Sequence, residues 1–163
     1  MVPAVIFGLA IVLAAAVQTS WPPELALRGV SPELVVVLVN SVGLVRGPKA
    51  GVAAGLLGGL LVASLAGSGA PFGGILAAYM LVGFLAGKLR GGVFAERLVI
   101  ALTAAGVAVI LARLVIMAVA PPPRLGRWFV ELALQAPYSA VLAVPVHLLV
   151  RFVHQRFPAG TEG

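Results

Sequence analysis

The sequence predicts an all-α integral membrane protein, in which a single domain over residues 1–163 forms a compact bundle of six transmembrane helices. Two features of composition and one of pattern support this prediction. Of the 163 residues, 61% are apolar and 10% are charged, whereas soluble domains have about 45–50% and about 25%. Apolar segments also recur along the chain, separated by breaks rich in proline and glycine. A chain with this much apolar surface is expected to fold in lipid.

Six apolar segments are candidates for membrane spans, because a helix needs about 20 residues to cross a bilayer. The expected spans, in chain order, cover about residues 2–17, 30–45, 50–66, 72–88, 98–120 and 129–150. The second segment is the least certain, because its apolar run from Leu34 to Val45 is short. A five-span protein with a re-entrant second segment is therefore the alternative.

The distribution of basic residues indicates the orientation. With six spans, seven basic residues fall on one side: Arg46, Lys49, Lys88, Arg90, Arg97, Arg151 and Arg156. The other side has only Arg28, Arg124 and Arg127. The positive-inside rule then places both termini in the cytoplasm. The net charge of +6 does not indicate a nucleic-acid partner, because no basic stripe with interleaved aromatic residues is present.

Small residues recur on the third segment, where Gly51, Gly55 and Gly59 stand four residues apart. Glycine inside a helix costs about 1 kcal/mol relative to alanine, but small residues allow membrane helices to approach closely. The sequence therefore predicts a helix-packing or partner-binding face formed by Gly51, Gly55, Gly58, Gly59 and Ala63, with a shorter version at Gly83 and Gly87. The pattern does not say whether the partner helix belongs to this chain or to another.

Arg113 is the residue of the fifth segment that costs most free energy to place in a membrane. Its charge lies about 12 Å before the break at Pro121. An ionisable residue within a membrane is a candidate for function, although its side chain can also extend to the interface. Glu131, near the start of the sixth segment, is a candidate partner across the intervening hairpin. The sequence thus predicts an intramembrane charge pair of Arg113 and Glu131.

The sequence contains no recognisable catalytic or metal-binding pattern. Its five acidic residues are dispersed, and neither a GxxxxGK[ST] nor an HExxH motif is present. His147 and His154 have no cysteine or carboxylate close by in sequence and would make a poor metal site. We therefore expect no enzymatic activity, no catalytic residues, no metal and no cofactor.

The order of these features resembles the family of the rod shape-determining protein MreD over about residues 29–89. The family's P-[DN]-L motif is matched by Pro32, Glu33 and Leu34. Its glycine-rich stretch is matched by Gly51, Val52, Gly55, Leu56 and Leu57. Its third motif is resembled by Gly73, Gly74, Tyr79, Gly83 and Phe84. Glu33 replaces the usual Asp or Asn, and Gly59 stands where the family often has Asp. The resemblance also implies a fold similar to the substrate-binding subunits of energy-coupling-factor transporters.

The resemblance implies a non-catalytic subunit of the bacterial cell-elongation complex, a multi-pass protein of the inner (cytoplasmic) membrane. Its implied role is to help to regulate or organise peptidoglycan synthesis and cell shape. Its implied partners are MreC, then RodA and a class B penicillin-binding protein, directly or through MreC. The filament protein MreB belongs to the same system, and membrane lipids surround the bundle.

The alternative function is a substrate-binding subunit of an energy-coupling-factor vitamin transporter. Such subunits have similar length and span number, and they carry an AxxxA motif in the first span that Ala10 and Ala14 match. A vitamin pocket should contain convergent polar and aromatic side chains near the outer loops. The chain offers few of these, which favours the interaction subunit.

Overall fold

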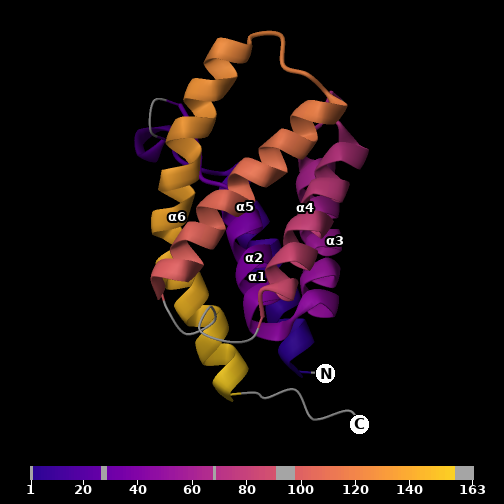
Figure 1. The fold of residues 1–163 in the computed structure, drawn as a ribbon, viewed down its shortest axis with the longest axis vertical. Helices are drawn as coiled ribbons and strands as arrows, with labels where there is room; N and C mark the ends of the chain where they lie inside the picture. The colour runs from indigo at the N-terminus through magenta and orange to yellow at the C-terminus, as the bar shows by residue number, and fades with distance from the viewer. Residues whose placement is uncertain (1, 27–28, 68, 91–97, 157–163) are drawn as a thin grey trace.

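The computed structural model describes residues 2–26, 29–67, 69–90 and 98–156. These residues form six α-helices and one short 3-10 helix, η1 (Figure 1). In chain order they are α1 (Val2–Thr19), η1 (Pro23–Leu25), α2 (Leu34–Arg46), α3 (Pro48–Leu65), α4 (Phe72–Lys88), α5 (Leu98–Val119) and α6 (Leu125–Arg156).

Each of the six apolar segments identified in the sequence overlaps one of the α-helices. Within the described residues, three helical segments are long and apolar enough to cross a membrane: Pro48–Leu65, Val99–Val119 and Leu125–Arg156. Three further apolar helices are shorter: Val5–Thr19, Leu34–Arg46 and Phe72–Lys88. The described fold is therefore all-helical, whereas the count of six spans stays a prediction.

Helix α2 is the centre of the bundle, although it is the shortest of the α-helices. It packs against each of the other five, and every residue from Val35 to Leu44 is buried. Its 13 residues extend for about 20 Å, whereas the 22 residues of α5 extend for about 33 Å, at about 1.5 Å per residue. The helix begins at Leu34, later than the expected start near residue 30, so the chain reaches it in a non-helical conformation.

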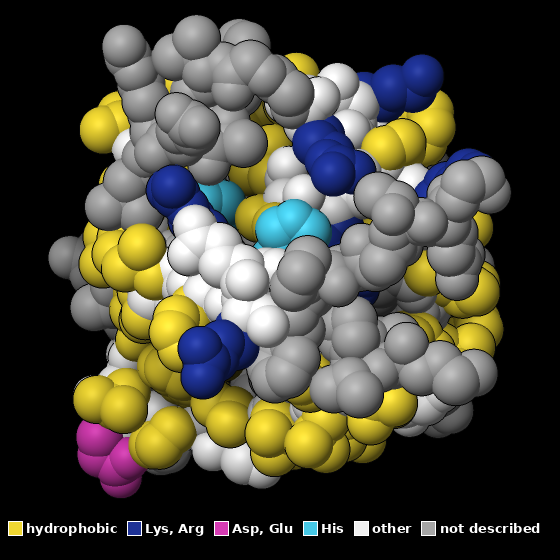
Figure 2. All heavy atoms as spheres, turned by 90° about the horizontal axis from the view of Figure 1, so that it is seen from below, with side chains coloured by type: hydrophobic (Ala, Val, Ile, Leu, Met, Phe, Trp, Pro, Cys, Tyr) yellow, Lys and Arg dark blue, Asp and Glu magenta, His cyan; other side chains and the backbone are white. Residues whose placement is uncertain are grey.

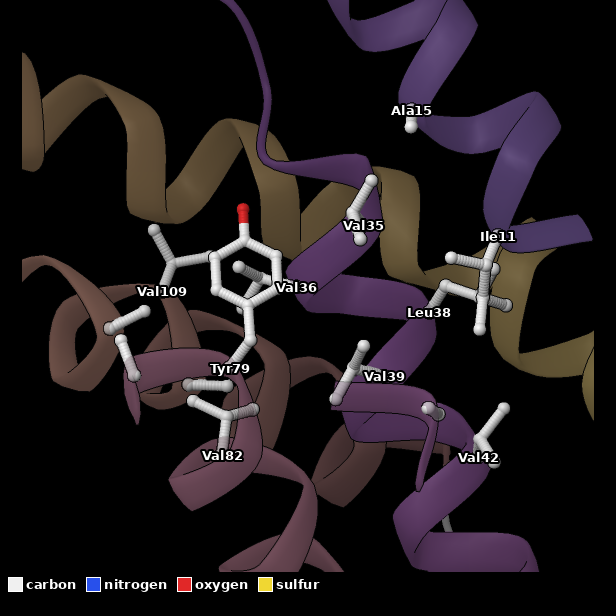
Figure 3. Packing of buried hydrophobic residues seen from close by; sticks show 14 of the residues in the cluster. Ile11, Ala15, Val35, Val36, Leu38, Val39, Val42, Tyr79, Val82 and Val109 are labelled. Atoms are coloured by element: carbon white, nitrogen blue, oxygen red, sulfur yellow. The ribbon is translucent and has the colours of Figure 1, made fainter. Parts of the chain in front are cut away.

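The main apolar core surrounds α2 (Figure 3). Valines on α2 pack against Ile11 of α1 on one side and against Tyr79 and Val82 of α4 on another. The ring of Tyr79 is 1% exposed and lies among Val36, Val82 and Val109, while its hydroxyl points away from this cluster (Figure 3). The hydroxyl of Tyr79 therefore marks one boundary of the apolar core.

The glycine row of α3 lies against α4 of the same chain. A methyl group added at Gly51 would meet the backbone carbonyl of Gly83, and one added at Gly55 would meet that of Tyr79. Gly59 faces Leu76, whose Cα would lie 3.1 Å from an added Cβ. Gly87 of α4 stands equally close to Pro48 at the start of α3. The close approach that the glycines allow is thus made within one chain.

A second face of α3 packs toward α2 and α1. A methyl group added at Gly58 would lie 2.6 Å from Val35 Cγ1 and 3.6 Å from Ile11 Cγ2. Ala63, the fourth member of the row that begins at Gly51, is 4% exposed. Small residues therefore occur on two neighbouring faces of α3, one toward α4 and one toward α2 and α1.

Basic residues gather at the end of the bundle where both chain termini lie (Figures 1 and 2). The described members of this cluster are Arg46, Lys49, Lys88, Arg90, Arg151 and Arg156. The described acidic residues belong to other segments: Glu24 to η1, Glu33 to the residue before α2, and Glu131 to the start of α6. Arg28 and Arg97 lie outside the described residues.

Candidate functional site

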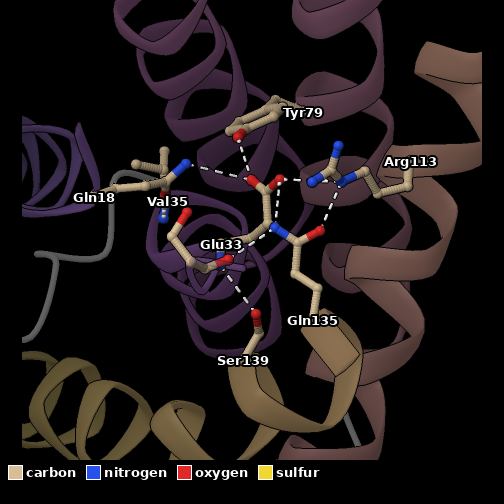
Figure 4. A network of polar contacts seen from close by, with 8 residues as sticks. Gln18, Glu33, Val35, Tyr79, Arg113, Gln135 and Ser139 are labelled. Atoms are coloured by element: carbon tan, nitrogen blue, oxygen red, sulfur yellow. Dashed lines mark hydrogen bonds and ion pairs between the residues drawn. The ribbon is translucent and has the colours of Figure 1, made fainter. Parts of the chain in front are cut away.

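Glu33 is the centre of a polar network inside the bundle (Figure 4). It immediately precedes α2, and its side chain is 14% exposed. The carboxylate therefore lies beside the N-terminus of a helix, where the unpaired N–H groups favour negative charge. Four other helices direct polar side chains to it.

Two side chains donate hydrogen bonds to Oε2 of Glu33. The hydroxyl of Tyr79, from α4, lies 3.0 Å away. The Nε2 amide of Gln18, from the end of α1, lies 3.4 Å away. This oxygen therefore links α1 and α4 to the start of α2.

The second carboxylate oxygen, Oε1, connects α5 and α6. Nε of Arg113 lies 3.4 Å from it, forming an ion pair between partly buried side chains. Nε2 of Gln135 donates to the same oxygen at 3.2 Å, and Oε1 of Gln135 accepts from Arg113 Nε at 2.7 Å. Arg113, Gln135 and Glu33 thus form a closed triangle of polar contacts.

The same side chains also satisfy backbone groups near the start of α2. The N–H of Glu33 donates to Oγ of Ser139 at 3.0 Å, and the N–H of Val35 donates to Oε1 of Gln18 at 3.0 Å. Gln135 donates to the carbonyl of Ser31 at 2.9 Å. The first N–H groups of a helix have no partner within it, so these contacts allow α2 to begin inside the bundle rather than at its surface.

This geometry suits a structural role for the charged groups. Both carboxylate oxygens already accept hydrogen bonds from the protein's own side chains. A buried carboxylate is stable only when it is paired and hydrogen-bonded, and this one receives both kinds of contact. The network therefore holds five helices in a fixed relative arrangement.

The structure corrects the expected pairing of Arg113. Arg113 pairs with Glu33, whereas Glu131 pairs with Arg127, four residues earlier on the exposed surface of α6, at 2.9 Å. The expectation assumed that the nearest acid along the α5–α6 hairpin would be the partner. Because α2 begins deep in the bundle, it brings Glu33 to the guanidinium instead.

The motif residues of the second segment have separate places in this arrangement. Pro32 is fully buried, Glu33 supplies the carboxylate and Leu34 begins α2. Gln135 of α6 links Glu33 to α5 through its contacts with Glu33 and Arg113. Thr103 and Ser64 take no part in the network, because their hydroxyls donate to carbonyls of their own helices.

Sequence reasoning missed two members of the network, Gln18 and Ser139, and did not give Tyr79 a role in it. One available signal was the need of an intramembrane arginine for an acid, combined with the position of Glu33 directly before an apolar segment. No comparable signal marks Gln18 or Ser139, because single amides and hydroxyls are common in membrane helices.

Metal binding has no support in the part of the chain that the structure describes, where no group of three or more His, Asp or Glu side chains could hold an ion. His154 lies near Arg46 and Arg90, and burial, followed by these two positive charges, lowers the pKa of its imidazole. That environment disfavours a cation rather than attracting one.

The helices and the internal ion pair define the class of the molecule. It is an all-helical membrane protein in which, among the described residues, an ion pair and its hydrogen bonds link helices of the same chain. The model of the family named rod shape-determining protein MreD matches residues 1–155. The chain therefore belongs to this family, whose role is in rod shape determination. Comparisons with curated proteins and with solved structures give no significant match.

Proposed function

We propose that this protein is a non-catalytic subunit of the bacterial cell-elongation complex, where it binds MreC and helps to organise peptidoglycan synthesis. The observation that carries the proposal is the family match over residues 1–155. Through MreC, or directly, the subunit would act on RodA and its class B penicillin-binding protein, in the system that also contains MreB. Its own polar core supports a scaffold, because the carboxylate of Glu33 is engaged by internal donors.

The proposed location is the bacterial inner membrane, with six spans and both termini in the cytoplasm. The basic residues at the end of the bundle that carries both termini support this orientation. A reporter fused to the C-terminus tests it, since a fluorescent protein active only in the cytoplasm should be bright and a periplasmic phosphatase should be inactive. The opposite result would reverse the orientation.

Affinity purification from native membranes in mild detergent tests the function. The tagged protein should recover MreC, with RodA or the penicillin-binding protein, whereas an unrelated multi-pass protein with the same tag and expression level should not. Recovery of a transmembrane coupling protein with two ATPases would instead identify a vitamin-transport subunit. Absence of every elongation protein from repeated purifications would contradict the proposal.

A further inference from the structure

A lipid-facing groove separates part of α4 from part of α5, and α2 forms its floor. The two helices meet where Gly74 of α4 lies against Val119 of α5. Away from this contact, α5 runs obliquely across the bundle (Figure 1), and a groove of about 300 Å³ lies between the two helices. The central residue of α2, Asn40, lines this groove.

Asn40 has a polar group without a partner in the described structure. Its side chain is 3% exposed, and its Nδ2 makes no hydrogen bond. Leaving an amide unpaired in an apolar environment costs several kcal/mol, and hydrocarbon offers no substitute. Asn40 lies six residues after Leu34, about 9 Å along α2, and therefore near the middle of that helix.

The walls of the groove have the spacing of helix-packing surfaces. On the α4 side the lining residues are Val82, Leu85 and Ala86, followed by Leu89 directly after the end of the helix. On α5 they are Ala104, Val107, Ala108 and Leu111. Both sets follow the i, i+3, i+4, i+7 pattern by which one face of a helix contacts another helix. Alanines occupy part of each wall, which allows close approach.

Apolar side chains at the lips of the groove stay exposed. Leu89 is 48% exposed and Val107 is 62% exposed, so neither is covered by the described chain. A lipid tail could cover them, but it has no hydrogen-bonding atom within the hydrocarbon core. A buried water needs two to four polar partners, whereas Asn40 is the polar side chain among the residues that line the groove.

We propose that this groove binds the transmembrane helix of a single-span partner, and that a polar side chain of that helix pairs with the amide of Asn40. The proposal rests on the proposed function, in which MreC is such a partner. A helix fits both observations together: it fills an apolar groove between two helical walls and brings a hydrogen-bonding side chain to the middle of α2.

Cysteine cross-linking tests the location, because the chain contains no cysteine. Val107→Cys places a thiol at the lip of the groove, and Val141→Cys on α6 is a matched control with 66% exposure. Single cysteines placed at successive positions in the transmembrane helix of MreC supply the second thiol. Cross-links should form from residue 107 with a helical period of three to four residues and should not form from residue 141.

Substitution of the amide tests the chemistry. Asn40→Leu keeps a similar volume and should lower the affinity for MreC about tenfold, which corresponds to about 1.4 kcal/mol. The thermal unfolding temperature of the purified protein alone should not fall, because Nδ2 has no internal partner to lose. Ser41→Ala, at the next buried position and outside the groove lining, should leave the affinity unchanged.

The outcomes separate this proposal from the proposed function. If wild-type protein does not bind MreC, the proposed function fails and the docking proposal fails with it. If MreC binds but cross-links form from residue 141 rather than residue 107, or if Asn40→Leu binds as tightly as wild type, the groove proposal alone is wrong. A co-purified phospholipid that protects residue 107 from thiol reagents while MreC is bound elsewhere would also overturn it.

Discussion

Tyr79 donates its hydroxyl hydrogen to Glu33 Oε2 across 3.0 Å, from a ring that is buried among valines. Its ring belongs to the apolar core, whereas its oxygen belongs to the polar network (Figures 3 and 4). One side chain therefore joins the two regions, and removing only its oxygen separates their contributions.

Tyr79→Phe should lower the free energy of unfolding by about 2 kcal/mol, because a hydrogen bond to a charged group is worth about 1.5–3 kcal/mol. The apolar ring is retained, so the loss reports on the hydroxyl. Tyr138→Phe is the matched control, since that hydroxyl donates to the carbonyl of Leu25 at an exposed position. Unfolding of both variants in mild detergent measures the difference. Equal losses would show that the hydrogen bond from Tyr79 to Glu33 stabilises the protein no more than the exposed bond of Tyr138 does.

Arg113→Gln should destabilise the protein by about 3 kcal/mol, because it leaves the partly buried carboxylate of Glu33 without its ion-pair partner. Arg127→Gln breaks the pair with Glu131 on the exposed surface of α6 and should cost less than about 1 kcal/mol.

A double-mutant cycle then identifies the partner of Arg113. Arg113→Gln should be non-additive with Glu33→Gln and additive with Glu131→Gln, because groups that do not share contacts behave independently. Strong coupling between Arg113 and Glu131 would restore the partner that the sequence suggested and contradict the observed pair.

Gly55→Ala should disrupt the contact between α3 and α4, because the added methyl group would meet the backbone of Tyr79 and Met80. Overpacking of this kind costs about 1–3 kcal/mol. Gly73→Ala is the control, since nothing lies within 4 Å of its added methyl group, and it should be neutral or slightly stabilising. Thermal unfolding and the yield of folded protein are the measurements, and equal stability of both variants would remove the packing interpretation.

The pH dependence of stability should include a contribution from His154, which lies beyond the expected end of the last span. Burial, with Arg46 and Arg90 nearby, lowers the pKa of His154 below its ordinary value of 6.5. The unfolded chain then binds the proton more readily, so stability falls as the pH drops below about 6.5.

His154→Gln should reduce this part of the pH dependence. Its measurement is the unfolding temperature between pH 5 and pH 8, compared with wild type over the same range. Arg151→Gln, also near the end of α6, is a control for a general change in charge. An identical pH profile for wild type and His154→Gln would contradict the contribution.

The helices could be predicted from the sequence, whereas the polar network could not, and the reason is physical. Apolar runs and proline-rich breaks are local, so the segments could be located from composition, as could the glycine row beginning at Gly51. The contact of Glu33 with Arg113 depends on the depth at which α2 begins. That depth is set by packing and by the contacts of Gln18 and Ser139, whose positions carry no local signal. Sequence proximity therefore favoured Glu131 as the partner.

The network around Glu33 also has a consequence for the order of assembly. Glu33 meets Tyr79 46 residues later in the chain, Gln135 102 residues later and Ser139 106 residues later. Because segments enter the membrane in the order of their synthesis, Glu33 is made long before its last hydrogen-bond partners. A chain that stops before α6 lacks two of the groups that hold α2 in place. Completion of the network thus coincides with insertion of α6, so native stability depends on a helix that is made after the other five.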